Sequence, residues 1–443
     1  MSFPRYPEYK DSGVEWLGEV PTHWDVISIK WLSPVKRGAS PRPIDDQKYF
    51  DNDGEFAWVR ITDVSACDGI LKETTQRLSE LGSSLSVKIA PGELFVSIAG
   101  TVGKPCLSAI KACIHDGFVY FPLLKLNPKF LYRVFEVGAC YGGLGKWGTQ
   151  LNLNTDTIGS IRVAVPPPDE LIQVLKFIDT ETAKIDALVD EQQRLIELLK
   201  EKRQAIISHA VTKGLNPDAP MKPSGVQWLG EVPAHWEAGP LKRYWTAIDC
   251  KHVTAEFVDD GIPLASIREV QGRWIALEEA KCTTEAFYEL LIEGDRRPTP
   301  GDLIFSRNAT VGEVGQVHAD HPRFAMGQDV VLLRKLLPEF SSDYMQFVIR
   351  SPAVTQQLAM LMVGSTFKRI NVEEIRSLVV PWPPGAEQSE IAAFLENEVE
   401  RADSLIAEAQ RAIDFLQERR TALISAAVTG QIDVRAIADR AAA

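Results

Sequence analysis

A phrase of thirteen residues occurs twice in this chain. SGVEWLGEVPTHW occupies residues 12–24 and SGVQWLGEVPAHW occupies residues 224–236, so eleven of the thirteen letters agree at an offset of 212 positions. Three further pairs of segments follow in the same order in both halves. They are APGELFVSIAGTVG (90–103) with TPGDLIFSRNATVG (299–312), LNTDTIGSIRVAVPPP (153–168) with INVEEIRSLVVPWPPG (370–385), and residues 177–212 with 394–429. Four landmarks in one order predict a duplicated unit with a constrained frame, because insertions and deletions collect only between them.

Each copy has three parts: the repeated phrase, a region of mixed patterning, and a long helix after a proline-rich stop. Strands are predicted where β-branched and aromatic residues cluster between Gly or Pro, at 55–64, 93–100, 117–126, 261–270, 301–308 and 326–336. Shorter helices are predicted near 128–140 and 341–361. The expected fold class is α+β, with two pseudo-symmetric mixed α/β domains joined by two long antiparallel α-helices that form a coiled coil.

Both long segments carry apolar residues at alternating spacings of three and four, which is typical of helices that pack along a shared seam. The stripe includes Ile185, Leu188, Leu195 and Leu199 in the first segment and Leu405, Leu416 and Leu423 in the second. We expect the two helices to pack antiparallel, because the chain must return to build its second half, and to act as a spacer between two heads. The alternative is a solvated amphipathic helix on each globule.

Charge limits the partners of such a chain. The formal net charge is −12, from 48 Lys and Arg against 60 Asp and Glu, which argues against a simple basic nucleic-acid binder. Residues 24–165 nevertheless hold 16 basic against 14 acidic side chains, whereas residues 386–443 hold 6 against 11. A polyanionic partner is therefore compatible with the sequence if local patches make the contacts.

Other composition features favour a cytoplasmic protein without a membrane span. No apolar run approaches the roughly 18 residues of a span, and the start MSFPRYPEYKDSG has no signal pattern. The six cysteines form no CxxC pair and are expected to be reduced thiols. The one close histidine pair, His318 and His321, lacks further ligands at metal spacing, so no metal site is expected.

No catalytic constellation is present in the sequence. The proline runs VPPPDE and PWPPGAE lack the leading acid or amide and the trailing aromatic of a D/N-P-P-Y/F/W methyltransferase loop, and no phosphate-binding glycine motif occurs. We therefore expect no bond chemistry from this chain alone. The repeated phrase supplies two tryptophans per copy, Trp16 and Trp24, then Trp228 and Trp236. An aromatic ligand platform is one reading of them, but a structural clasp between each head and the helix pair is favoured, with His23 and His235 as polar caps.

These features together resemble one family. The segment YPEYKDSGVEWLGEVPTHWDV (6–26), its repeat, the PG[ED]L…TVG element and the two helical segments are similar to the specificity (S, HsdS) subunit of type I restriction-modification systems. The resemblance covers essentially the whole chain. It implies a first target recognition domain at 1–168, a conserved spacer helix at 169–212, a repeated segment with a second recognition domain at 213–385, and a terminal helix and tail at 386–443.

The resemblance also implies function and partners. Each domain would read one half of a bipartite, asymmetric double-stranded DNA target, and the helices would set the gap between the halves. Two methyltransferase (M) subunits would dock on the helices and supply S-adenosylmethionine and adenine-N6 chemistry, and restriction (R) subunits would add Mg²⁺- and ATP-dependent translocation and cleavage. This chain itself would hold no cofactor. A two-headed coiled-coil adaptor without DNA binding is the alternative from another class, and a DNA-modifying enzyme with an unfamiliar site is a third.

Base and phosphate contacts favour Arg, Lys, Asn and Gln on exposed loops. The candidate DNA-binding residues are Lys146, Gln150 and Asn152 in one loop, Lys368 and Arg369 in its counterpart, and Arg307 with Asn308 after a predicted strand. Asn154 and Asn371 recur at one position of the duplicated frame, which favours a structural turn or cap over base reading.

Overall fold

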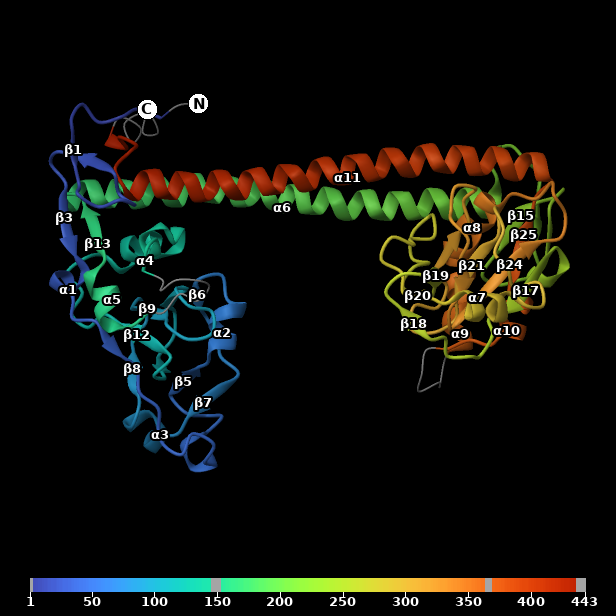
Figure 1. Ribbon diagram of the computed structural model, residues 1–443. Helices are drawn as coiled ribbons and strands as arrows, with labels where there is room; N and C mark the ends of the chain where they lie inside the picture. The colour runs from blue at the N-terminus through green and yellow to red at the C-terminus, as the bar shows by residue number, and fades with distance from the viewer. Residues whose placement is uncertain (1–2, 145–152, 363–368, 436–443) are drawn as a thin grey trace. The chain divides into compact units, whose positions relative to one another are not determined.

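The computed structural model describes residues 3–144, 153–362 and 369–435 (Figure 1). The chain divides into two compact units: unit 1 comprises residues 1–192 and 411–443, and unit 2 comprises residues 193–410. Two long helices, α6 (Pro168–Lys213) and α11 (Gly385–Val428), each contribute one end to each unit. Both units mix helices and strands, so the mixed α/β character is as predicted. Among the described residues, no helix is long and apolar enough to cross a membrane.

Unit 1 is built on a five-stranded sheet with strand order β4-β12-β9-β10-β6 and a four-stranded sheet with order β7-β5-β11-β8. The strands are β1 (Tyr9–Asp11), β2 (Glu19–Pro21), β3 (Asp25–Ser28), β4 (Lys36–Arg37), β5 (Phe56–Val59), β6 (Ile70–Leu71), β7 (Gln76–Leu78), β8 (Val87–Ile89), β9 (Leu94–Ser97), β10 (Pro105–Ser108), β11 (Ala112–Ile114), β12 (Phe118–Tyr120) and β13 (Arg162–Val165). The α-helices besides α6 and α11 are α1 (Ile29–Leu32), α2 (Ile61–Ala66), α3 (Glu80–Ser84), α4 (Pro128–Val137) and α5 (Thr155–Ser160).

Unit 2 has two four-stranded sheets, with orders β17-β24-β21-β22 and β18-β20-β19-β23. The strands are β14 (Met221–Pro223), β15 (Glu231–Pro233), β16 (Glu237–Pro240), β17 (Trp245–Asp249), β18 (Phe257–Val258), β19 (Ile262–Ala265), β20 (Cys282–Thr283), β21 (Leu303–Ser306), β22 (Val314–Gln316), β23 (Ala325–Met326), β24 (Val330–Lys335) and β25 (Val379–Trp382). The α-helices besides α6 and α11 are α7 (Glu285–Ile292), α8 (Ser342–Arg350), α9 (Pro352–Leu361) and α10 (Val372–Ser377).

The matched segments form matched ladders. In unit 1, β1 pairs with β2 so that Tyr9 faces Pro21, and in unit 2, β14 pairs with β15 so that Met221 faces Pro233, in each case 212 positions later. The pairing of β3 with β13 recurs in the same register as the pairing of β16 with β25. The central ladders β9–β12 and β21–β24 also correspond. In each, a serine at the end of one strand (Ser97 or Ser306) lies opposite the first residue of the other strand (Phe118 or Val330). The repeated sequence therefore encodes a repeated frame in each unit.

Each central strand separates two cores. In β9, Leu94 and Val96 face a core shared with α4 and the ends of the long helices, whereas Phe95 faces a second core with residues of β5 and β11. In β21, Phe305 faces the helix-side core and Ile304 faces the outer one. This follows from the two-residue period of a strand, which sends successive side chains to opposite faces. Each unit thus has a helix-side core, made by the frame, and an outer lobe.

A buried glutamate fastens the repeated phrase to the first turn of α6. Glu170 accepts hydrogen bonds from the Trp24 indole Nε1 at 2.9 Å and from the Tyr6 hydroxyl, and its other oxygen lies 2.8 Å from His23 Nε2. Trp24 is fully buried. A Cβ added to Gly430, just beyond the end of α11, would meet the Pro21 ring at 2.4 Å. We call this set the unit 1 clasp, because it holds the start of one long helix and the end of the other.

Unit 2 repeats the arrangement with one donor fewer. Glu387, in the first turn of α11, lies 2.8 Å from His235 Nε2 and accepts a hydrogen bond from the Trp236 indole at 3.0 Å. Position 218, which corresponds to Tyr6, holds an exposed aspartate. The Glu387 side chain is 25% exposed, against 7% for Glu170. The outer tryptophans Trp16 and Trp228 are only partly buried. This set is the unit 2 clasp.

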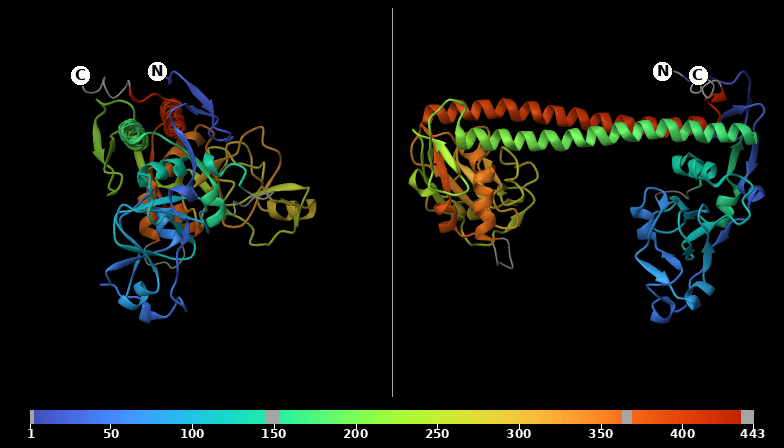
Figure 2. Two further views of the ribbon diagram at one scale, coloured as in Figure 1. Left: turned by 90° about the vertical axis from the view of Figure 1, so that its left-hand side faces the viewer. Right: turned by 180° about the vertical axis from the view of Figure 1, so that it is seen from behind.

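The two long helices lie side by side within each unit (Figures 1 and 2). In unit 1, Arg420 of α11 bonds to Asp186 of α6 at 2.9 Å, and in unit 2, Arg203 of α6 pairs with Asp403 of α11 at 3.0 Å. These ion pairs correspond to each other, since 203 and 186 become 420 and 403 on adding 217. The helix contacts in the two units are therefore copies of one another.

The buried stripe of the helices differs from the predicted one. Ile185, Leu199, Leu416 and Leu423 lie in it as predicted, but Leu188, Leu195 and Leu405 are exposed. The positions that are at least partly buried are instead Val189, Ile196 and Arg203 in α6 and, 217 positions later, Ile406, Ile413 and Arg420 in α11. The prediction was wrong at those three leucines because leucines one residue away from the true stripe mimic its spacing.

Local predictions have mixed outcomes. The predicted strand 55–64 ends at Val59, and helix α2 takes up residues 61–66 instead. The predicted helix 341–361 is broken into α8 and α9 at Ser351, before a proline at the first position of α9. The capping role of Asn154 and Asn371 is confirmed, because each side chain accepts backbone N–H groups at the start of α5 or α10 in a capping box.

Candidate nucleic-acid interface

A cluster of arginines lies at one edge of the sheets in unit 1. Arg60 directly follows β5, and His115 directly follows β11, which pairs with β5 in parallel so that Val59 and Ile114 face each other. Because the carboxyl ends of parallel strands meet at one edge, Arg60 and His115 lie together. Arg37, at the end of β4, donates to the carbonyl oxygen of Asp116. We call the three arginines Arg37, Arg42 and Arg60 the basic edge.

The charge of the basic edge is exposed. The guanidinium of Arg42 lies 3.6 Å from the Asp116 carboxylate, and its side chain is 83% exposed. Arg37 and Arg60 are also exposed. Burial lowers the pKa of His115, and although Asp116 opposes this, Arg37 and Arg60 lower it further. The ring is therefore neutral near pH 7, and the surface charge comes from three arginines against one aspartate.

The backbone at this edge is closely packed. A Cβ added to Gly38 would lie 2.2 Å from the carbonyl oxygen of His115. Only glycine therefore lets the chain that follows β4 come this close to the backbone at His115. The His115 ring lies tilted against Trp58 and edge-on to Phe118, with centroids 5.9 Å and 4.6 Å away. The backbone beside Arg37 and the turn at His115 are consequently closely packed, which suits a surface that must present donors in fixed positions.

Unit 2 places different residues at the corresponding positions. Arg37 faces Val119 across the sheet in unit 1, and Asp249 faces Val331 in the same register in unit 2. The hydrogen bond from the Ile98 backbone N–H to the Gly117 carbonyl oxygen in unit 1 recurs in unit 2 as the bond from the Arg307 N–H to the Asp329 carbonyl oxygen. The frame therefore puts an aspartate where unit 1 has an arginine, and an arginine where unit 1 has an isoleucine.

The unit 2 edge is a paired network rather than an open basic surface. Arg307 is only 5% exposed and lies 3.5 Å from Asp249 and 3.3 Å from His252. Asn308 donates to Asp329 at 3.1 Å, and the guanidinium of Arg369 lies 3.3 Å from the same carboxylate. The buried atoms Arg307 Nε and Asp249 Oδ1 have no hydrogen-bond partner among the described residues. Two polar groups at this edge thus retain unused bonding capacity.

The structure brings three predicted contact residues together and corrects one. Arg307, Asn308 and Arg369 meet at this edge, and Arg369 is exposed. The expectation of an exposed loop tip is wrong for Arg307, because its place directly after a central strand buries it. The other candidates, Lys146, Gln150, Asn152 and Lys368, lie outside the described residues. In the described part of the chain no group of three His, Cys, Asp or Glu could hold a metal ion.

The arginines of the basic edge were missed by sequence reasoning. One signal was available: Arg60 follows the strand residues FAWV, just as Arg307 follows LIFS. The sequence did not reveal that they converge, because the three arginines come from segments that are far apart in the sequence and are brought together by strand pairing, β4 with β12 and β5 with β11.

Comparison with known proteins connects this geometry to a family. Residues 293–413, which include β21, β24 and most of the paired network of unit 2, match the family model of the type I restriction modification DNA specificity domain. This part of the chain therefore carries a type I restriction modification DNA specificity domain, and the chain as a whole is similar to type I specificity subunits. It is 21% identical to the type I restriction enzyme MjaVIII specificity subunit of Methanocaldococcus jannaschii, over 94% of each chain. It is also 21% identical to the EcoKI specificity subunit of Escherichia coli K12, over 63% of this chain and 60% of that one.

Solved structures agree on the fold. A chain from a study of complex assembly and conformational transition of the type I R-M system aligns with a TM-score of 0.68 at 14% identity, covering 93% of this chain and 99% of that chain. The HsdS subunit from Thermoanaerobacter tengcongensis aligns with a TM-score of 0.50 at 15% identity, covering 93% and 98%. Both alignments extend over most of this chain, so the frame and the outer lobes both fall within the shared fold.

Proposed function

We propose that this chain is the DNA sequence-specificity subunit of a type I restriction-modification complex. Each unit reads one half of a bipartite, asymmetric double-stranded DNA target, and the pair of long helices acts as an antiparallel coiled coil that sets the gap. The observation that carries the proposal is one frame presenting two different edges. Matched ladders hold Arg37 in unit 1 and Asp249 in unit 2, so the two heads offer different donor and acceptor patterns to DNA.

The complex would supply the chemistry that this chain lacks. We propose that two methyltransferase subunits bind S-adenosylmethionine and methylate adenine at N6, and that restriction subunits use ATP and Mg²⁺ for translocation and cleavage, in the cytoplasm where the DNA lies. The net charge of −12 fits this division, because basic surfaces on partners can share the neutralisation of phosphates.

The exposed apolar residues of the long helices support docking of two like partners. Leu188 and Phe415 are 51% and 72% exposed in unit 1, and Leu405 and Leu198 are 49% and 54% exposed in unit 2. The two pairs correspond at an offset of 217. Such side chains at equivalent positions of the two units fit two copies of one subunit, each of which would cover one pair.

The docking proposal predicts a change of stoichiometry. Phe415→Glu should remove one methyltransferase subunit from the purified complex, Leu198→Glu should remove the other, and the double variant should bind neither. Native mass spectrometry of the co-expressed complex measures this. Gln417→Glu is the matched control, since it adds the same charge two residues along, about 200° around the helix. Retention of two subunits by both single variants would contradict the docking surface.

The function itself is tested by sequencing the methylome of a host that carries this chain with its methyltransferase partner. The expected result is one adenine-methylated motif split by a fixed gap. Exchanging residues 24–165 for those of a relative should then change one half of the motif and leave the other half and the gap intact. An unchanged methylome would refute DNA reading, and a change in both halves would refute the division between the two units.

A further inference from the structure

Two cysteines of unit 1 meet at the wall of an open hollow. Cys67 directly follows α2 and Cys106 lies in β10, and their Sγ atoms are 3.6 Å apart. Cys106 is fully buried in the core of the outer lobe, whereas Cys67 is partly exposed. A disulfide has an S–S distance of about 2.05 Å, so the sulfurs need to approach by only about 1.5 Å to bond.

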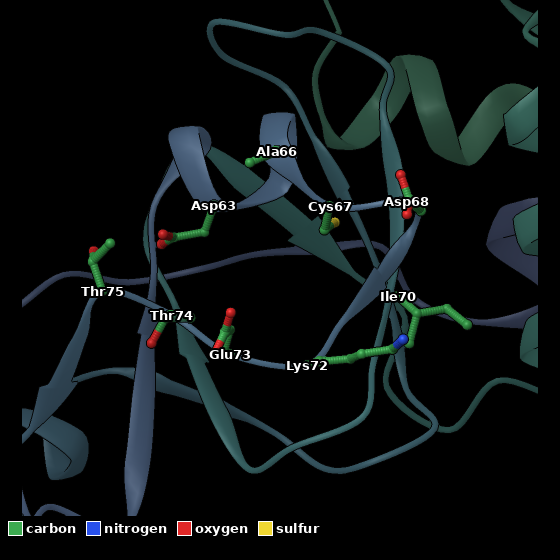
Figure 3. Close-up of a pocket in the computed structure, with 9 residues that line it drawn as sticks. All are labelled: Asp63, Ala66, Cys67, Asp68, Ile70, Lys72, Glu73, Thr74 and Thr75. Atoms are coloured by element: carbon green, nitrogen blue, oxygen red, sulfur yellow. The ribbon is translucent and has the colours of Figure 1, made fainter. Parts of the chain in front are cut away.

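The hollow gives a reagent access to Cys67. It has a volume of ≈ 450 Å³, and the close-up shows the Cys67 side chain at its wall (Figure 3). The lining residues are Asp63, Ala66, Cys67, Asp68, Ile70, Lys72, Glu73, Thr74 and Thr75. Three carboxylates against one ammonium give the hollow a negative charge, which repels anionic reagents and admits small neutral ones.

The neighbours of Cys67 favour its thiolate. The hydrogen bond from the Cys106 thiol lowers the pKa of Cys67, and the nearby Lys104 ammonium acts in the same direction. Lys104 is held there by a 2.9 Å hydrogen bond to the Cys67 carbonyl oxygen. The same thiol–thiol bond and burial raise the pKa of Cys106. Since the thiolate is the nucleophile, Cys67 is the attacking sulfur and Cys106 the one that resolves the intermediate.

We propose that Cys67 and Cys106 form a reversible disulfide on reaction with a small neutral peroxide. The Cys67 thiolate attacks one peroxide oxygen, the O–O bond breaks, and the leaving hydroxide takes up a proton to become water. Cys67 is then a sulfenic acid. The Cys106 sulfur attacks the Cys67 sulfur, the S–O bond breaks, and a second water leaves with the Cys106 proton. Two thiols are oxidised by two electrons and one peroxide is reduced to two waters.

The test is thiol mapping on the full-length protein after exposure to hydrogen peroxide. Remaining thiols are alkylated, and the protein is digested between the two cysteines and analysed by mass spectrometry. Two of the six thiols should disappear, one cross-linked peptide should join Cys67 to Cys106, and dithiothreitol should restore both. Anionic glutathione disulfide at the same concentration should give the cross-link more slowly.

Variants separate this site from general oxidation. Cys282→Ser is the matched control. Cys282 is also partly exposed, but its thiol donates to the Ala280 carbonyl oxygen and not to a second thiol, so its loss should leave the cross-link unchanged. Cys106→Ala and Cys106→Ser should both halt Cys67 at a sulfenic acid that a sulfenic-acid probe traps. The proposal is overturned if wild-type protein keeps six thiols, if Cys67 proceeds to sulfinic acid while Cys106 stays reduced, or if glutathione disulfide reacts faster than peroxide.

Discussion

Replacing Glu170 by alanine is expected to destabilise unit 1 by about 3 kcal/mol. The carboxylate accepts hydrogen bonds from the Trp24 indole and the Tyr6 hydroxyl and lies against His23, and the Glu170 side chain is 7% exposed. Removing it leaves the Trp24 and Tyr6 donors buried without acceptors, and each such group costs about 1–3 kcal/mol. Hydrogen exchange of the full-length protein should show faster opening of the residues around β2 and the end of α11.

Glu387→Ala supplies the matched control in unit 2. Glu387 accepts from Trp236, is closer to solvent, and has no tyrosine at the position of Tyr6. Water can replace part of the hydrogen bonding that Glu387 provides. The substitution is therefore expected to destabilise the protein by about 1–2 kcal/mol, and the effect should be confined to unit 2. Equal effects of the two substitutions, or no effect of either, would show that the clasps do not fasten the helices.

Removal of the basic edge should weaken DNA binding strongly. The triple variant Arg37→Ala, Arg42→Ala and Arg60→Ala is expected to lower the affinity of the complex for its target by about 10–100-fold. Each phosphate contact contributes about 0.9 to the slope of log affinity against log salt, so the slope should fall by up to about 3. Titrations of a labelled duplex at several salt concentrations measure both quantities.

Lys111→Ala is the control for the basic edge. Lys111 is exposed, pairs with Glu55 at 2.6 Å, and precedes β11, so it lies at the opposite end of that strand from His115. Its loss removes one positive charge from unit 1 and should change affinity and salt slope little. If the triple variant kept the affinity and slope of the native complex, the basic edge would not face DNA.

The frame was predictable because its signals are local and occur twice. The phrase at 12–24, the proline stops and the capping residue Asn154 each predict their structure from neighbouring letters, and the second copy checks the first. The helix stripe was harder. Leu188 and Leu195 satisfy heptad spacing as well as Val189 and Ile196 do, and only burial distinguishes them.

The sites depended on contacts that no local pattern reveals. Glu170 looks like any acidic residue at the start of a helix, yet its partners come from a segment about 150 positions earlier. The basic edge joins Arg37, Arg60 and Asp116 through strand pairing. Arg307 was taken for a surface residue because its type is polar, whereas its position at the end of a buried strand decided its environment.

Successive side chains along β9 and β21 alternate between two cores, and this limits which substitutions each core can feel. Substitutions at Phe95 or Ile304 alter the outer lobe, whereas substitutions at Val96 or Phe305 alter the core against the long helices. Neighbouring residues of one strand are therefore constrained by two different cores. Exchange of an outer lobe is therefore expected to need changes at every second position of its central strand, while the alternate positions, which pack against the long helices, can stay unchanged.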